Sequence, residues 1–301
     1  MPYPILAVGE VLWDVLPSGK QLGGAPANFT FQCRGLGAAA RLVTRVGDDD
    51  LGREVLDRFR SLGLPTDTVQ MDSAAPTGTV DVALAPDGQP RYTIRRGAAW
   101  DRIEADALAL GRAAAADAIC FGSLAQRDEP SRGSIRALVS AARPGALRMF
   151  DVNLRAPFVD RGVIEESLRL ANALKLNDQE LPALAAMFGL PAEPSTALDG
   201  LACRFDLALV ALTRGAGGSL LFADGTWSDH PGVPVEVSDT IGAGDAFTAA
   251  LVVGRVAGLP LDAINRHANE VAAFVCSRPG GTPTLPDALK LPLPVEPEAR
   301  P

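Results

Sequence analysis

The chain has 301 residues, of which 47% are hydrophobic, enough for one large globular domain with a buried core. Its net charge of -8 disfavours nucleic acid as a partner, because binding to a phosphate backbone needs a basic surface. The N-terminus lacks a basic leader segment and no apolar run reaches about 20 residues, so we expect a cytoplasmic protein without membrane contact. The scattered cysteines predict buried thiols at Cys33, Cys120, Cys203 and Cys276.

Short apolar runs alternate with segments of helical period along the chain. Strands are expected at residues 5–9, 41–47, 117–122, 147–152, 173–176 and 207–213. Helices are expected at residues 50–63, 161–172, 242–258 and 261–278, before a proline-rich tail from about Leu291. This alternation predicts an α/β fold, in which helices flank a doubly wound, mostly parallel sheet.

One region departs from this alternation. Residues 77–96 alternate in polarity on both sides of a Pro-Asp-Gly turn at residues 86–88, which predicts a β-hairpin. A hairpin inserted into an α/β chain often covers a binding site. We therefore expect one main domain with a small lid.

Two glycines and an acid open an apolar helical run in the segment SDTIGAGDAFTAAL, residues 238–251. The backbone amides of Gly242, Ala243 and Gly244 can converge on an anion there, because a helix start has free N–H groups and favours negative charge. Asp245 would oppose simple anion binding, but it can accept the proton of a hydroxyl group that attacks the anion. The pattern predicts phosphoryl transfer. The alternative is a glycine-rich turn with an aspartate cap.

A second glycine cluster comes early in the chain. Gly23 and Gly24 precede Asn28 and a helical run, a pattern suited to a polyhydroxylated ligand packed against main chain. Asp14 lies on an otherwise apolar strand, where its carboxylate needs either solvent or donors such as sugar hydroxyls.

Two nucleotide-binding patterns were tested against the sequence. Residues 35–40 match GxGxxA, but they follow a helix and precede a strand, which reverses the order of a dinucleotide-binding segment. We interpret them as a helix stop, which disfavours a nicotinamide-dependent dehydrogenase. No GxxxxGK[ST] segment occurs, so a P-loop NTPase is excluded.

Polar residues follow the strands expected at 147–152 and 173–176, and they include Asp151, Asn153, Arg155, Lys175, Asn177 and Glu180. The carboxyl ends of parallel strands meet at one edge of a sheet, so we expect these side chains on one rim. Glu180 either caps a helix that begins at Asp178 or lies near metal and phosphate. Thr213 precedes a glycine turn that either holds nucleotide phosphate or is a tight β-turn.

Together these segments resemble the ribokinase-like (PfkB) family of sugar kinases over essentially the whole chain. Residues 23–55 are similar to the N-terminal signature of the family, and residues 239–251 resemble its specific C-terminal signature. The resemblance implies that Asp245 is the catalytic base and that the amides of residues 242–244 form the anion hole.

The resemblance also implies a domain organisation. The whole chain, residues 1–301, would form a single domain, with a β lid built from about residues 10–22 and 77–98 that excludes water from the sugar. Lids in such folds can pair between protomers, so a homodimer stays open as an alternative.

The resemblance implies ATP and Mg²⁺ as cofactors, with K⁺ in addition in many members, and a small sugar as the substrate. The implied sugar-contacting residues are Asp14, Gly24, Asn28, Arg95 and Arg155. The implied nucleotide-side residues are Lys175, Asn177, Thr213, Gly215, Gly218 and Asn269. The implied ion-binding acids are Glu180 near Mg²⁺ and Asp239 near K⁺.

Within the family, the segments GEVLWDVLP, GGAPANF and DVNLR resemble the fructokinase branch, although Val152 stands where that branch more often has proline. Fructose is the expected substrate. Arg95 and Arg155 resemble arginines of 2-keto-3-deoxygluconate kinases. A sugar acid needs such a pair and a neutral sugar does not, so 2-keto-3-deoxygluconate is the main alternative substrate. Another sugar or nucleoside kinase of the family also stays open. Outside the class, the alternative is a non-catalytic sugar sensor, which would be expected to have lost Asp245.

Overall fold

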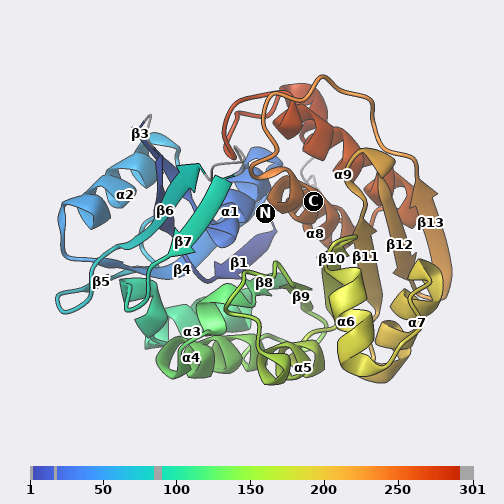
Figure 1. Cartoon of the computed structure of the whole chain (residues 1–301), viewed down its shortest axis with the longest axis horizontal. Coiled ribbons are helices and arrows are strands. Elements are labelled where there is room, and N and C mark those ends of the chain that lie inside the picture. Colours follow the sequence, from blue (N-terminus) through green and yellow to red (C-terminus); the bar gives the residue numbers. More distant parts are fainter. Residues whose placement is uncertain (1–2, 17–18, 85–89, 292–301) are drawn as a thin grey trace, which may run out of the picture.

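The computed structural model describes residues 3–16, 19–84 and 90–291. Its main element is a nine-stranded sheet of order β13-β12-β11-β10-β9-β8-β1-β4-β5 (Figure 1). The strands of this sheet are β1 (Pro4–Val8), β4 (Ala39–Gly47), β5 (Val69–Asp72), β8 (Ala118–Gly122), β9 (Leu147–Asp151), β10 (Ala173–Asn177), β11 (Leu209–Thr213), β12 (Ser219–Ala223) and β13 (Thr226–His230). The seven strands from β5 to β11 in the sheet order run parallel to one another, whereas β12 runs antiparallel to both β11 and β13.

Helices cover both faces of the sheet. One face carries α1 (Ala25–Gly35), α2 (Asp50–Ser61), α8 (Ala243–Val256) and α9 (Leu261–Cys276). The other carries α3 (Ala107–Ala115), α4 (Glu129–Ser140), α5 (Arg161–Leu170), α6 (Leu181–Phe188) and α7 (Pro194–Phe205). The predicted doubly wound sheet is therefore confirmed, and Figure 1 shows the two helical layers above and below it.

The central strand β1 is apolar along its whole length because helices cover both of its faces. Ile5 and Ala7 belong to the core on the α1/α8/α9 face, whereas Leu6 and Val8 belong to the core on the opposite face. Because successive side chains point to opposite faces, a strand covered on both faces must be apolar throughout.

A second, four-stranded sheet has the order β3-β2-β6-β7. Its strands are β2 (Leu12–Leu16), β3 (Gly19–Gly23), β6 (Gly78–Leu84) and β7 (Pro90–Ile94). The expected hairpin is present, because β6 pairs antiparallel with β7, and β2 joins it by pairing parallel with β6. The turn expected at residues 86–88 lies outside the described residues.

Some local expectations need adjustment. Cys33 and Cys120 are buried, but Cys203 is exposed and Cys276 is half-buried, so the prediction of four buried thiols was wrong. Cys203 lies on the outer side of α7, and the apolar composition of that segment did not reveal which helix face it occupies. The expected tail falls mostly at 292–301, outside the described residues.

Other expectations agree with the structure. Helix α1 ends at Gly35 and β4 begins at Ala39, which confirms the helix-stop interpretation of residues 35–40. Among the described residues, no helix is both long enough and apolar enough to span a bilayer.

Candidate active site

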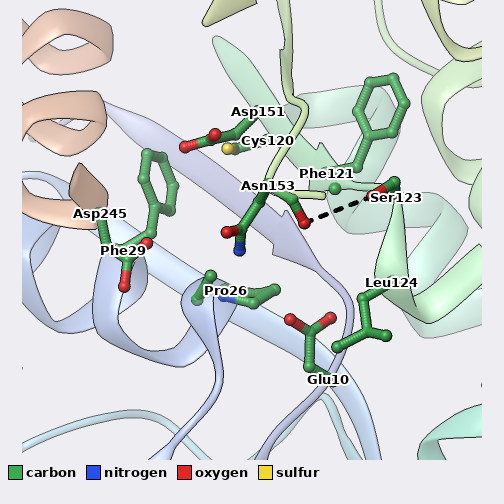
Figure 2. Close-up of a pocket in the computed structure, with 12 residues that line it drawn as sticks. Glu10, Pro26, Phe29, Cys120, Phe121, Ser123, Leu124, Asp151, Asn153 and Asp245 are labelled. Atoms are coloured by element: carbon green, nitrogen blue, oxygen red, sulfur yellow. Dashed lines mark hydrogen bonds between the residues drawn. The ribbon is translucent and has the colours of Figure 1, made fainter. Parts of the chain in front are cut away.

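A pocket lies at the carboxyl ends of the central strands β1, β8 and β9, in the crevice where parallel α/β sheets bind ligands (Figure 2). Glu10 reaches it from the loop after β1, and Asp151 and Asn153 reach it from the end of β9. The first turns of two helices complete the lining, with Pro26 from α1 and Asp245 from α8. Segments that are far apart in the sequence thus meet at one place.

The start of α8 places Asp245 in this pocket. Gly242 precedes the helix with φ 75°, a conformation that glycine adopts without strain. A Cβ atom there would lie 2.5 Å from the Cα of Gly281, so any side chain at this position would clash with the neighbouring loop. The Asp245 carboxylate accepts a 2.8 Å hydrogen bond from the side-chain amide of Asn28, which fixes its orientation.

Free backbone amides surround the same helix start. Within the described chain, the amides of Gly242 and Gly244 donate to no protein acceptor, and the amide of Ala243 reaches the Thr240 oxygen only at 3.4 Å. These N–H groups, together with the helix dipole, favour an anion beside Asp245. Residues 242–245 therefore combine anion-binding donors with a carboxylate.

Burial raises the pKa of Asp245 to about 6, although the hydrogen bond from Asn28 opposes the shift. The negative charge of Asp151 raises this pKa further, whereas the positive charges of Lys175 and Arg155 lower it. At neutral pH the carboxylate is mostly ionised and is a stronger base than an ordinary aspartate. A carboxylate with a pKa just below neutral pH is suited to act as a general base.

Lys175 lies beneath the pocket in a buried ion pair. Its ammonium is 3.1 Å from one carboxylate oxygen of Asp151, whose other oxygen accepts a 2.8 Å hydrogen bond from Thr248. Burial alone would lower the pKa of Lys175, but the carboxylates of Asp151, Glu180 and Asp245 raise it above its usual value. Gly244 leaves room for this group, since a Cβ atom there would lie 3.3 Å from the Lys175 nitrogen.

Asn177 and Glu180 bond to one another's backbone. The Asn177 side-chain oxygen accepts a 2.9 Å hydrogen bond from the Glu180 amide, and Glu180 accepts a 2.9 Å bond from the Asn177 amide. The second oxygen of Glu180 accepts from the Leu154 amide at 2.7 Å. These bonds hold a turn at 178–180, and α6 begins at Leu181 rather than at Asp178, with no side-chain hydrogen bond capping its start.

Four other residues expected on the nucleotide side lie around β11 and β12, and they are Thr213, Gly215, Gly218 and Asn269. Thr213 ends β11 opposite Asn177 of β10. Gly218 has φ 77° and packs against the backbone of residues 230–232, where no side chain would fit. The side-chain nitrogen of the buried Asn269 donates to the Ser219 hydroxyl at 2.7 Å and to the backbone oxygen of Asn265 at 2.8 Å, so it is bonded inside the protein. Gly215 has φ 54° in the turn between the strands.

Three of the expected sugar-contacting residues gather beside the pocket. Gly24 has φ 108°, and a Cβ atom there would lie 2.5 Å from the backbone oxygen of Glu10, so glycine allows α1 to approach that loop. Asn28 bonds to Asp245, as described above. Burial raises the pKa of Asp14, and the positive charge of Arg155 opposes this shift.

The two expected arginines differ in their surroundings. Arg155 is exposed, and its charge lowers the pKa values of Glu10, Asp14 and Asp245, so it acts on the pocket. The guanidinium of Arg95 instead bonds both carboxylate oxygens of Asp81 on β6, at 2.9 and 3.2 Å. Neither arginine is among the residues that line the pocket.

Asp239 joins two loops. One carboxylate oxygen accepts from the Ile241 amide at 3.0 Å, and the other accepts from the Gly280 amide at 2.9 Å. These bonds hold the 280–281 segment against the start of α8. In the described part of the chain, no group of three or more His, Cys, Asp and Glu residues is placed to hold a metal ion.

Glu10 is a pocket residue that sequence reasoning missed. Its side chain is only 3% exposed and it lines the pocket, and burial raises its pKa to about 7. The available signal was a glutamate placed directly after the apolar strand β1, at the edge where ligands bind.

Comparisons with known proteins agree with this geometry. A profile described as pfkB family carbohydrate kinase matches residues 14–288. A fructokinase from Klebsiella pneumoniae is 32% identical over 269 residues, which cover 85% of this chain and 86% of that protein. An uncharacterized sugar kinase from Pyrococcus horikoshii is 30% identical over 308 residues, which cover 95% of this chain and 94% of that protein.

Solved structures are similar over the same extent. The crystal structure of the Pyrococcus horikoshii protein matches with a TM-score of 0.81 at 28% identity, covering 92% of this chain and 93% of that one. A fructokinase with bound ATP from Xylella fastidiosa matches with a TM-score of 0.83 at 25% identity, covering 94% of each chain. The fold and these relatives define a carbohydrate kinase. The chain belongs to the pfkB family of carbohydrate kinases.

Proposed function

We propose that this carbohydrate kinase transfers the γ-phosphate of ATP to a terminal hydroxyl group of fructose. The observation that carries the proposal is the partly buried Asp245 carboxylate, which lies in the pocket beside the free amides of Gly242 and Gly244. Fructokinases from Klebsiella pneumoniae and Xylella fastidiosa, at 32% and 25% identity, support the choice of sugar.

Each group at the start of α8 has a distinct task in this reaction. Asp245 takes the proton of the sugar hydroxyl as its oxygen attacks the γ-phosphorus. The amides of residues 242–244 and the helix dipole stabilise the negative charge on the transferring group. Asn28 keeps the Asp245 carboxylate oriented through its 2.8 Å hydrogen bond. The sheet β3-β2-β6-β7 is the proposed lid, formed by about residues 10–22 and 77–98, which excludes competing water.

We assign the nucleotide and its metal ion to residues on the carboxyl edge of the sheet. ATP is bound in solved structures of the Pyrococcus horikoshii and Xylella fastidiosa relatives. We assign its phosphates to the free amides at α8 and to the glycine turn of Gly215 and Gly218. Glu180, held at the end of β10, would lie near Mg²⁺, which supplies positive charge to the phosphates. Asp239 would lie near K⁺, beside the loop that it ties to α8.

2-Keto-3-deoxygluconate is the second candidate substrate, and Arg155 is the observation that favours it. Its positive charge acts on the pocket and is available to a carboxylate. Against this candidate, Arg95 is already paired with Asp81, and neither arginine lines the pocket. A bidentate arginine clamp for a sugar acid is therefore incomplete.

A substrate panel tests the proposal directly. ADP release would be measured with fructose, ribose, glucose, 2-keto-3-deoxygluconate and nucleosides at fixed ATP and Mg²⁺. We expect the highest kcat/KM with fructose. A higher value with the sugar acid would replace fructose by the second candidate, and sugar binding without ADP release would favour a non-catalytic sensor.

The pH dependence of turnover follows from the raised pKa of Asp245, about 6. A protonated base cannot accept the sugar proton, so kcat/KM for the sugar should fall as the pH decreases through about 6, towards a tenfold loss per pH unit. An ordinary aspartate would give this midpoint near pH 4. Rates measured from pH 5 to 8 at saturating ATP check the prediction, and a flat profile down to pH 5 would contradict it. Glu10 titrates in the same pocket, so the profile is also measured with Glu10→Gln. A fall in kcat/KM near pH 6 that persists in this variant is due to Asp245.

A further inference from the structure

Glu10 is held firmly at the wall of the pocket. It follows the central strand β1, its side chain is 3% exposed, and α1 packs against its backbone through Gly24. Figure 2 shows its carboxyl group pointing into the pocket, which Asp245 enters from a different side. Glu10 and Asp245 therefore contact different parts of any ligand there.

The Glu10 carboxyl has no hydrogen bond from another residue in the described part of the chain, in contrast to Asp151 and Glu180. Among the described residues, no hydrogen bond or ion pair joins it to another side chain or amide, whereas Asp151 and Glu180 are each bonded through both oxygens. Burial raises its pKa to about 7, its own amide and the charge of Arg155 lower it, Asp245 raises it, and Arg127 lowers it. Buried carboxyl oxygens without donors are expected only where a ligand or water supplies them.

The carboxyl groups near Glu10 disfavour an acidic ligand, although the positive charge of Arg155 opposes this effect. The charge of Arg127 is committed to Asp101, at 2.7 Å, and Arg95 is paired with Asp81. Arg155 forms no ion pair with a carboxylate among the described residues, and its charge lowers the pKa values of Glu10, Asp14 and Asp245. A sugar acid whose terminal hydroxyl lies at Asp245 would place its carboxylate at the other end of the pocket, among these acids.

We propose that Glu10 is a specificity-determining residue, whose carboxylate accepts hydrogen bonds from neighbouring hydroxyl groups of a neutral sugar and disfavours sugar acids. The inference rests on the proposed sugar kinase function. A carboxylate that no other residue occupies can accept from adjacent hydroxyls, and such charge-assisted bonds are stronger than neutral ones. Asp245 then receives the hydroxyl at the opposite end of the same molecule.

Kinetics of two variants test the inference. Glu10→Ala should raise KM for fructose by about 10- to 100-fold, the loss of one or two hydrogen bonds to a charged group, while KM for ATP stays within about twofold. Glu10→Gln keeps the shape and removes the charge. It should lower the ratio of kcat/KM for fructose to that for 2-keto-3-deoxygluconate by about tenfold or more.

The controls separate binding from folding and from the choice of sugar. Glu165→Gln, at a surface pair with Arg169, should leave every constant unchanged. Thermal unfolding shows whether each variant is folded. If Glu10→Ala is not folded, the isosteric Glu10→Gln is titrated with sugar in a calorimeter. We expect Glu10→Gln to bind the sugar more weakly than the wild-type protein. An unchanged sugar affinity, or an unchanged fructose-to-acid ratio, would overturn the role of Glu10 while wild-type fructokinase activity stands. If the wild-type protein uses a different neutral sugar, the fructose assignment fails and the Glu10 comparison is made on that sugar.

Discussion

Asp245→Asn should lower kcat by about 10²- to 10⁴-fold, the usual contribution of a positioned general base. An asparagine can still accept the hydrogen bond from Asn28, but it cannot take the sugar proton. Sugar and ATP should still bind, because the amides of residues 242–244 are unchanged. The measurement is ADP release at saturating fructose and ATP, together with calorimetric titration of each ligand.

The same variant should be at least as stable as the wild-type protein at neutral pH. The pKa of Asp245 is raised from 3.8 to about 6, so the folded state holds the proton more tightly than the unfolded state. The carboxyl therefore costs stability as the pH rises from about 4 to 6, and asparagine removes this cost. We expect a higher Tm than wild type at pH 7.5 and a smaller difference at pH 5.

A matched control is available on the neighbouring helix. Asp262 also lies in the first turn of its helix, α9, but it is exposed and away from the pocket. Asp262→Asn should leave kcat unchanged. Turnover of Asp245→Asn within tenfold of wild type would remove the proposed base and the mechanism built on it.

Lys175→Met should cost about 3 to 5 kcal/mol of unfolding free energy, because it leaves buried carboxylates without their cation. The ammonium pairs with Asp151 at 3.1 Å, and its charge also acts on Glu180 and Asp245. For a domain of this size the loss corresponds to a decrease in Tm of roughly 10 °C. Urea unfolding at pH 8 measures the free energy.

Second variants identify the cause of this loss. Asp151→Asn combined with Lys175→Met should be more stable than Lys175→Met alone, because it removes the orphaned charge. The loss should also be smaller at pH 5.5, where the remaining carboxyls protonate more readily. Lys290→Met, at an exposed pair with Asp287, should change stability by less than about 1 kcal/mol. Equal effects at Lys175 and Lys290 would show that the buried pair does not hold the site together.

The two variants separate chemistry from scaffold. Asp245 contacts the pocket and should affect turnover without weakening the fold, whereas Lys175 lies beneath the pocket and should affect the fold first. Lys175 was expected on the nucleotide side from its place at the end of a strand. Its 3.1 Å pair with Asp151 instead assigns it to neutralising the buried acids around the base. Contact with nucleotide stays a proposal.

Arg95 shows where local reasoning stopped. Its resemblance to an arginine of 2-keto-3-deoxygluconate kinases suggested a partner for Arg155 in binding a sugar acid. The cross-strand geometry of β6 and β7 instead brings Arg95 to Asp81, a pairing that depends on strand register rather than on spacing along the chain. Asn269 is similar, because its bonds to Ser219 arise only when α9 packs on β12.

The sequence by itself determined the α/β class, the hairpin and the helix start that carries Asp245. These features are local: apolar period distinguishes strands from helices, and Gly242 marks the point where α8 begins. Only the tertiary structure decided which acids share the pocket. Glu10 and Asp245 are 235 residues apart in the numbering, and they meet because parallel strands and helix starts converge at one edge of the sheet. Their charges and free oxygens depend on that convergence, which no short segment of the chain encodes.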